Sequence, residues 1–425
     1  MSTMQDKDRT KLNSILKALK SGEISISDTK SILENRKKPE EKDFGINSRI
    51  STSTKTCAKE VSASENGIAI IGMSGQFPKS KTLHEFWNNI ANGIDCISEV
   101  PPERWPAEKY YDADANVPGK TYCKWQGVLE DVDKFDPLFF NISPIEAEIM
   151  DPQQRLILES CWGCIEDAGI NPQSLSETKC GVFVGCGVSD YGQQGDGQEL
   201  NAYGLMGSSP SILAARISYI LNLKGPCMAI DTACSSSLVA ISEACNSLML
   251  NTSDIALAGG VHIMLSPAGF VMASKAGMLS PSGRCHTFDA RADGFVPGEG
   301  VGVVLLKRLS DAIRDRNPIY GVIRGWGVNH DGKTNGITAP SANSQIELEK
   351  EVYRRFGINP ETITMAEAHG TGTKLGDPIE IEALTESFQH FTNKKNYCAL
   401  GSVKSNIGHS VKAAGVAGSL KYYFL

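Results

Sequence analysis

The chain has 425 residues, of which 41% are hydrophobic and 21% charged, and its formal charge at pH 7 is -7. This composition is typical of a globular protein, and a chain of this length still fits one large α/β unit. The acidic balance argues against broad affinity for nucleic acid, which needs clustered Lys and Arg, so we expect no nucleic-acid partner.

The N-terminal residues are polar and do not lead into an apolar signal region, and the longest apolar runs, such as 301–306, are too short to span a bilayer. Twelve cysteines are scattered along the chain. Together these features predict a cytoplasmic protein with reduced thiols and no membrane span. Cys161 and Cys164 lie in a helical pattern without a second pair at metal spacing, so we expect buried core thiols rather than metal ligands.

Residues 7–36 carry apolar side chains at helical spacing in two short stretches separated by Ser21-Gly22. Two such amphipathic helices cannot bury their apolar faces alone, so they need a partner or a second copy. A helical spacer without a partner is the alternative, and the composition does not decide between the two. Residues 37–65 are rich in Lys, Glu, Ser and Thr, which predicts a flexible linker.

From residue 66 onward, short apolar runs alternate with helical patterns. The strand-like runs are 68–71, 181–184, 228–230, 255–258, 301–306 and 319–324. The helical stretches include 154–167, 237–250 and 344–356. Strands that are apolar without interruption and alternate with helices predict layered α/β architecture with buried sheets.

Cys234 lies between the strand-like run ending at Asp231 and the helical pattern starting at Ser237. A cysteine on such a strand-to-helix turn is near the positive end of the helix dipole, which is expected to lower its thiol pKa below the free value of about 8.5. The same turn directs backbone N–H groups at an oxyanion formed beside the sulfur. Cys234 is therefore the candidate nucleophile, although a cysteine taken alone is more often structural.

His369 and His409 differ from the other five histidines because both stand among glycines and small hydroxyl residues, which allow close approach of a ligand. With Cys234 they suit one chemistry, in which sulfur holds an acyl group and the histidines stabilise negative charge on a second substrate. Lys404 lies five residues before His409 and could organise a histidine or a carboxylate. A metal site competes with this interpretation, but neither histidine has a second ligand nearby at the usual spacing.

Three ordered motifs carry a resemblance to the β-ketoacyl synthases of the thiolase superfamily, and most closely to the ketosynthases of type I modular polyketide synthases. They are Asp231-Thr-Ala-Cys-Ser-Ser-Ser237, Glu367-Ala-His-Gly-Thr-Gly-Thr373 and Gly401-Ser-Val-Lys-Ser-Asn-Ile-Gly-His409. The resemblance runs from about Gly67 to Gly418. It implies a thiolase-like α/β/α/β/α fold with an N-terminal half at about 66–310 and a C-terminal half at about 318–425.

The resemblance also implies roles for single residues. Cys234 would accept an acyl chain from the phosphopantetheine of a carrier protein, and its own N–H would form part of the oxyanion hole. His369 and His409 would promote decarboxylation of a malonyl-type thioester, whose carbanion attacks the Cys234 thioester in a Claisen condensation. The remaining expected site residues are Lys404, which would organise the histidines, and Thr371, Thr373 and Asn406, which would bind the pantetheine arm.

By the same resemblance, no cofactor or metal is bound directly, and the expected partners are acyl carrier proteins, neighbouring synthase modules and a second copy in a homodimer. Cys234 distinguishes this chain from chain-length partner subunits and from loading ketosynthases, which commonly carry glutamine, and His369 from non-elongating ketosynthases. The stretch Ile142-Ser-Pro-Ile-Glu146 resembles systems whose acyltransferase is a separate protein.

Family members continue for several tens of residues beyond the second histidine motif, where a glycine-rich turn supplies the other oxyanion N–H. The second half of the fold is therefore expected to be truncated at Leu425. This leaves two alternatives open: a truncated or split ketosynthase that serves as an interaction fragment without activity of its own, and a thiolase-like enzyme acting on coenzyme A esters.

Overall fold

A computed structural model describes residues 67–191 and 202–424. The predicted helical segment 7–36 and the linker 37–65 lie outside the described residues, so both stay predictions. Within the described residues, no helix combines the length and the apolar character that crossing a bilayer requires.

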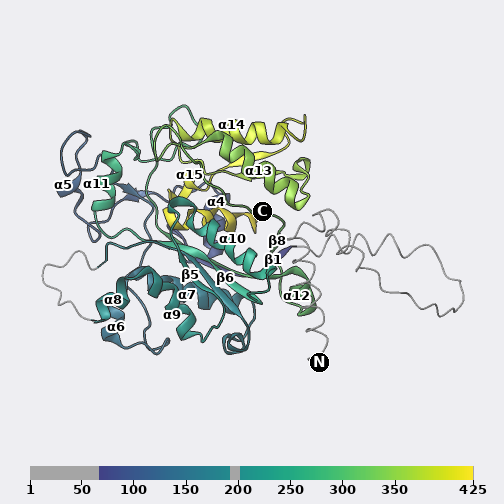
Figure 1. Cartoon of the computed structure of the whole chain (residues 1–425). Helices are drawn as coiled ribbons and strands as arrows, with labels where there is room; N and C mark the ends of the chain where they lie inside the picture. The colour runs from purple at the N-terminus through teal and green to yellow at the C-terminus, as the bar shows by residue number, and fades with distance from the viewer. Residues whose placement is uncertain (1–66, 192–201, 425) are drawn as a thin grey trace, which may run out of the picture. The chain divides into compact units, whose positions relative to one another are not determined.

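A six-stranded sheet forms the centre of the fold, with the strand order β5-β4-β6-β7-β1-β8 (Figure 1). Its strands are β1 (Ile68–Gln76), β4 (Cys180–Gly185), β5 (Cys227–Ile230), β6 (Ile255–His262), β7 (Gly300–Arg308) and β8 (Gly321–Ile323). Strands β4, β5 and β6 are parallel, whereas β7 is antiparallel to both β6 and β1. The predicted strands all form. Five of them extend beyond the apolar run by one to five residues because pairing with neighbours continues past it, whereas the predicted run 319–324 shortens to Gly321–Ile323.

The two faces of this sheet bury two separate apolar cores. On β1, the side chains of Ala69 and Ile71 pack in one core, and those of Ile68 and Ile70 pack in the other, as the alternation of a strand requires. Helix α7 (Pro152–Asp167) covers the first face and α10 (Ser236–Met249) the second (Figure 1). Both faces are covered, which explains why the strands read as uninterrupted apolar runs.

The runs 228–230 and 319–324 are exceptions to the prediction of buried strands, because they form the two edge strands, β5 and β8. Strand β5 lies at the edge of the sheet, where it pairs only with β4, and the side chain of Met228 is 46% exposed. An apolar run alone does not distinguish a central strand from an edge strand, because pairing depends on the rest of the fold. The open edge of β5 is therefore a feature that only the structure shows.

The second half of the domain builds on a parallel pair of short strands, β9 (Met365–Glu367) and β10 (Ala399–Gly401). Helices α13 (Ala342–Phe356) and α14 (Gly376–Gln389) pack against each other beside this pair (Figure 1). A further short pair is β2 (Ser98–Glu99) with β3 (Trp125–Gln126). The other α-helices of the described residues are α4 (Leu83–Ala91), α5 (Ala107–Tyr110), α6 (Pro144–Ile149), α8 (Ala202–Ser208), α9 (Pro210–Ile220), α11 (Ala268–Lys275), α12 (Leu309–Arg314), α15 (Lys404–Ile407) and α16 (Ala414–Tyr422).

Cys161 and Cys164 confirm the prediction of core thiols, since both are buried in α7. Burial raises the pKa values of both Cys161 and Cys164. Thiols that are fully buried in an apolar core carry little thiolate and are closed to substrates and metal ions, so they are poor metal ligands and nucleophiles.

Candidate active site

Cys234 lies in a 3-10 turn, Ala233–Ser235, that joins the end of β5 to the start of α10. Ala233 has a φ of 56°, which is uncommon for a residue with a side chain. Hydrogen bonds hold this turn: Asp231 accepts from the Ala233 N–H at 3.1 Å, and Ser236 Oγ donates to the Ala233 carbonyl at 2.7 Å. The strand-to-helix turn predicted around the cysteine is thus present, and it fixes the direction of the sulfur.

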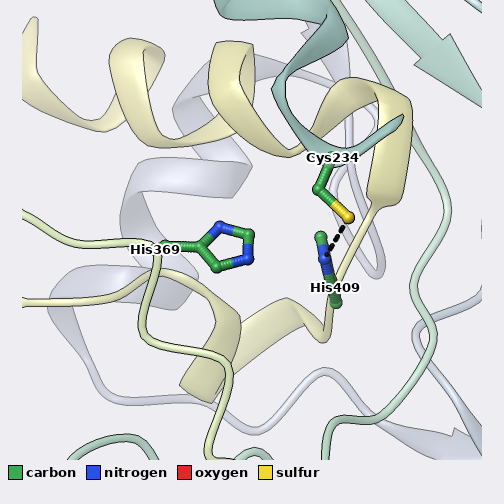
Figure 2. Close-up of side chains that lie close together, drawn as sticks. All are labelled: Cys234, His369 and His409. Carbon is green, nitrogen blue, oxygen red and sulfur yellow. Dashed lines mark hydrogen bonds between the residues drawn. The ribbon is translucent and has the colours of Figure 1, made fainter. Parts of the chain in front are cut away.

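His409 contacts that sulfur directly, because its Nε2 lies 3.1 Å from Cys234 Sγ (Figure 2). The backbone of His409 is hydrogen-bonded to a segment far away in the sequence. Its N–H donates to the Val296 carbonyl at 2.7 Å, and its carbonyl accepts from the Gly298 N–H at 2.9 Å. Its ring packs edge-on against Phe295. His409 therefore has little freedom to move away from the thiol.

The hydrogen bonds of His409 also fix its tautomer. The Val411 N–H donates to His409 Nδ1 at 3.2 Å, so Nδ1 carries a lone pair rather than a proton. In a neutral imidazole the proton is then on Nε2, which faces the sulfur. His409 is consequently a hydrogen-bond donor to a Cys234 thiolate.

His369 follows β9 and faces the same point from the opposite wall (Figure 2). Its ring centroid lies 5.3 Å from that of His409, with the two planes nearly perpendicular. Glu380 of α14 accepts from the backbone N–H of His369 at 2.5 Å and from that of Gly370 at 2.8 Å. Glu380 therefore anchors the loop that carries this histidine.

Lys404 is the first residue of α15 and follows β10, so it stands beside His369 at the carboxyl ends of two adjacent parallel strands. Its side chain is only 4% exposed. A buried ion pair supports this corner: Glu367 accepts from Lys421 Nζ at 2.7 Å and from the Val403 N–H at 2.5 Å. Burial lowers the pKa of Lys404, while nearby carboxylates, Glu367 first among them, oppose this change.

A cavity of about 770 Å³ gives access to these groups. Its lining includes Cys234, His369 and Lys404, together with residues of the loop near His330 and of helix α16. Cys234, His369 and His409 offer ligand atoms that all lie within 4.8 Å of one another, a spacing that would also suit a metal ion. The buried cation of Lys404 opposes a second cation there.

Burial raises the pKa of the Cys234 thiol, while Lys404 and Lys412 oppose this change. The expectation of a lowered thiol pKa is therefore wrong in direction. The sequence shows the helix terminus but not how far the sulfur is removed from water, and desolvation disfavours the charged thiolate. Thiolate formation depends on the cations and N–H donors around the sulfur.

Both histidines are held neutral. Removal from water, together with Lys404, lowers the pKa of His409 well below its usual value, and the same two causes lower that of His369 to about 3 although this residue keeps part of its surface exposed. At physiological pH each ring is an uncharged imidazole with one N–H donor and one acceptor. Such a pair can stabilise an anion by hydrogen bonding without itself being titrated.

Thr371, Thr373 and Asn406 are not brought to the sulfur, and none of them lines the cavity described above. Thr371 and Thr373 share a hydrogen bond of 3.2 Å between their hydroxyls, and Thr373 also accepts from the Gly376 N–H. Asn406 donates to the Ile94 carbonyl at 3.1 Å. Their role in binding the pantetheine arm stays a prediction.

The sequence interpretation assigned no role to Glu367, Glu380, Lys412 or Lys421, which hold the site together. Glu367 opens one of the quoted motifs, which was a usable signal. No pattern in the sequence indicates Lys412 or Lys421, because Lys412 is 181 residues from its partner Asp231 and Lys421 is 54 residues from its partner Glu367.

Comparison with known proteins matches both halves of the chain to one family. Residues 65–312 match the β-ketoacyl synthase N-terminal domain, and residues 320–424 match the β-ketoacyl synthase C-terminal domain. The chain is 54% identical over 358 residues to polyketide synthase PksL of Bacillus subtilis, covering 84% of this chain and 8% of that protein. It is 48% identical over 358 residues to a phenolphthiocerol/phthiocerol polyketide synthase subunit of Mycobacterium tuberculosis, of which it covers 20%.

Solved structures show the same relationship. The ketosynthase from module 6 of the bacillaene synthase of Bacillus subtilis superposes with a TM-score of 0.78 at 52% identity, covering 84% of this chain and 61% of that one. The oxazolomycin ketosynthase domain of Streptomyces albus superposes with a TM-score of 0.81 at 41% identity, with 84% and 62% covered. The chain thus has the thiolase-like α/β fold of these enzymes, and it belongs to the β-ketoacyl synthase family.

Proposed function

We propose that this chain extends polyketide chains by decarboxylative Claisen condensation between an acyl group on Cys234 and a malonyl-type thioester on a carrier protein. The observation that carries the proposal is the convergence of one thiol and two neutral imidazoles, whose polar atoms lie within 4.8 Å of one another, with Cys234 and His369 lining the cavity and His409 Nε2 3.1 Å from Cys234 Sγ. Two of its relatives are a polyketide synthase and a polyketide synthase subunit, and this chain spans only 8% and 20% of their lengths.

In the first half-reaction, the Cys234 thiolate attacks the carbonyl carbon of the acyl thioester. A C–S bond to the enzyme forms, the C–S bond to pantetheine breaks, and the carrier thiol leaves with the proton that Cys234 gave up. The Cys234 N–H lies close to its own sulfur and stabilises negative charge there. The N–H of His409 Nε2 adds a second donor on the other side of the sulfur.

In the second half-reaction, the malonyl thioester loses carbon dioxide and the electron pair remains as an enolate. The imidazole N–H groups stabilise the enolate oxygen, since a donor aimed at developing charge in a dry site lowers the barrier. The enolate carbon then attacks the acyl carbonyl on Cys234. The enzyme C–S bond breaks, and the thiolate is regenerated.

Carrier proteins are the partners that this chemistry requires, and we propose neighbouring synthase modules as further partners. Supply of the malonyl group by a separate acyltransferase stays a prediction from the stretch 142–146. The long acyl substrates of such enzymes need space, and a second cavity of about 690 Å³ adjoins the first, sharing Ser235, Leu238 and Ile337 as lining.

The test is direct acylation. The chain is incubated with carrier proteins that bear acetyl, butyryl or longer acyl groups on phosphopantetheine, and peptide mass spectrometry locates the added mass. We expect acyl mass on the peptide with Cys234. Acylation by coenzyme A esters but not by any carrier would favour the thiolase-like alternative, and failure with every donor by a folded chain would favour an interaction fragment.

We propose further that the chain forms a homodimer through β5. This strand is at the edge of the sheet, and Cys227 and Met228 are exposed on it. Two copies related by a two-fold axis would pair their β5 edges and remove the exposed edge. Light scattering should give twice the chain mass, and Met228→Lys together with Ala229→Pro should give the monomer mass. A wild-type monomer at micromolar concentration would contradict the proposal.

A further inference from the structure

An ion pair links the loop that carries Cys234 to the loop that carries His409. Lys412, three residues after His409, contacts Asp231, three residues before Cys234. Asp231 uses the same carboxylate oxygen to accept from the Ala233 N–H at 3.1 Å. The lysine therefore reaches, through one carboxylate, the strained residue that sets the direction of the sulfur.

Two glycines leave the space in which this contact lies. A Cβ atom at Gly187 would lie 2.9 Å from Lys412 Cε and 2.9 Å from Asp231 Oδ2. A Cβ atom at Gly260 would lie 2.7 Å from the Lys412 carbonyl oxygen. The Lys412 side chain is 15% exposed, whereas that of Asp231 is 52% exposed, so the lysine is packed and its carboxylate partner meets solvent. The packing of the lysine distinguishes this pair from one in which both side chains are freely solvated and hold each other weakly.

The charged and titratable groups near the sulfur are His409, His369, Lys404 and Lys412. Both histidines are neutral at physiological pH, so the two lysines are the cations that favour the thiolate. Lys412 itself is surrounded by Asp231, His262 and Cys186. Burial, and Lys412 after it, lower the pKa of His262 to about 4, whereas burial raises that of Cys186 to about 12, so both are uncharged and Asp231 is the counter-ion.

The Lys412 loop also controls the His409 ring. Val411, the residue before Lys412, has a φ of 38°, which a β-branched residue adopts only under constraint. Its N–H is the donor that fixes the tautomer of His409. Releasing Lys412 would allow Val411 to relax, and His409 would lose the bond that keeps the Nε2 proton facing the sulfur.

We infer that Lys412 is a positioning residue, which with Asp231 forms a clamp that holds Cys234 Sγ against His409 Nε2. The inference rests on the proposed function only in assigning the thiol its task, because the clamp acts on the reactivity of Cys234 itself. Alkylation of Cys234 by iodoacetamide needs neither a carrier protein nor a malonyl group. The clamp and the condensation reaction can therefore fail independently.

The test follows the alkylation rate of Cys234 between pH 6 and 10 by peptide mass spectrometry. We expect Lys412→Met and Asp231→Asn each to slow alkylation about tenfold at pH 7 and to displace the profile to higher pH. Both variants release the clamp, so the thiolate loses the His409 donor, and Lys412→Met also removes a cation. The double variant should be no slower than the slower single variant, as expected for two residues acting as one unit. Lys412→Arg, which keeps the charge, should stay within about threefold of the wild type.

Lys307→Met is the matched control, because Lys307 is also 15% exposed and pairs with Asp315 away from the site. It should leave the alkylation profile unchanged. An unchanged profile in folded Lys412→Met, with only a lower unfolding temperature, would reduce the pair to a structural role and overturn the inference. Faster alkylation in Asp231→Asn would also overturn it, since Lys412 would then act by charge alone.

Discussion

Replacing Cys234 with alanine is expected to abolish acyl transfer to the protein, a loss of at least about 1000-fold relative to the wild type. Among the described residues, Cys234 is the one thiol that lines the 770 Å³ cavity, and its sulfur contacts His409. Without it no covalent intermediate forms, and the acyl chain cannot wait for the second substrate. The measurement is transfer of a radiolabelled acyl group from a carrier protein.

Cys227→Ala is the matched control, because Cys227 is the more exposed thiol and lies only seven residues away on β5. It should retain full labelling. Labelling that survives in Cys234→Ala but is lost in Cys227→Ala would show that Cys227, not Cys234, accepts the acyl group. Equal labelling of both variants would indicate unspecific acylation.

The sequence predicted those parts of the fold that depend on local pattern. Helix α10 was expected at 237–250 and begins at Ser236, and α7 was expected at 154–167 and begins at Pro152. Helix α7 extends at its N-terminus because the Asp151 side chain caps it, accepting from the Gln153 N–H, whereas α10 begins directly after the turn that carries Cys234. The position of β5 at an edge depends on which strands pair across the chain, and no local pattern contains that information.

The site shows the same division. Cys234, His369, His409 and Lys404 were selected from motifs, and the structure brings their loops together around one point. The electrostatics was harder to predict, because the thiol pKa depends on burial by segments far away in the chain. Supporting residues such as Lys421 were missed for the same reason, since a lysine on an apolar helix gives no sign of the glutamate it will meet.

Alanine variants of the two histidines are expected to lose activity at different steps of the reaction. His409 donates to the sulfur, so His409→Ala should slow both acylation of Cys234 and decarboxylation. His369 has no hydrogen bond to the sulfur among the described contacts, so His369→Ala should acylate within about threefold of the wild type. It should still lose decarboxylation by about 100- to 1000-fold, the magnitude typical of one lost donor to a developing anion.

The pH dependence separates these steps further. The pKa of His369 is about 3, and His409 is lowered in the same direction, so decarboxylation by the acylated wild type should stay level between pH 6 and 8. Acylation should rise with pH over the same range, because the Cys234 pKa is raised and the thiolate is the reactive form. Release of labelled carbon dioxide and acyl mass on Cys234 measure the two steps separately.

His390→Ala is the control for these variants, since His390 is exposed at the end of α14 and contacts Arg354. It should leave both rates unchanged. Decarboxylation that falls with decreasing pH from 8 to 6 would mean that an imidazole titrates in this range and acts as a base, which contradicts neutral donors. Equal loss of acylation in His369→Ala and His409→Ala would contradict separate roles for the two histidines, which are inferred from the 3.1 Å contact between His409 Nε2 and Cys234 Sγ.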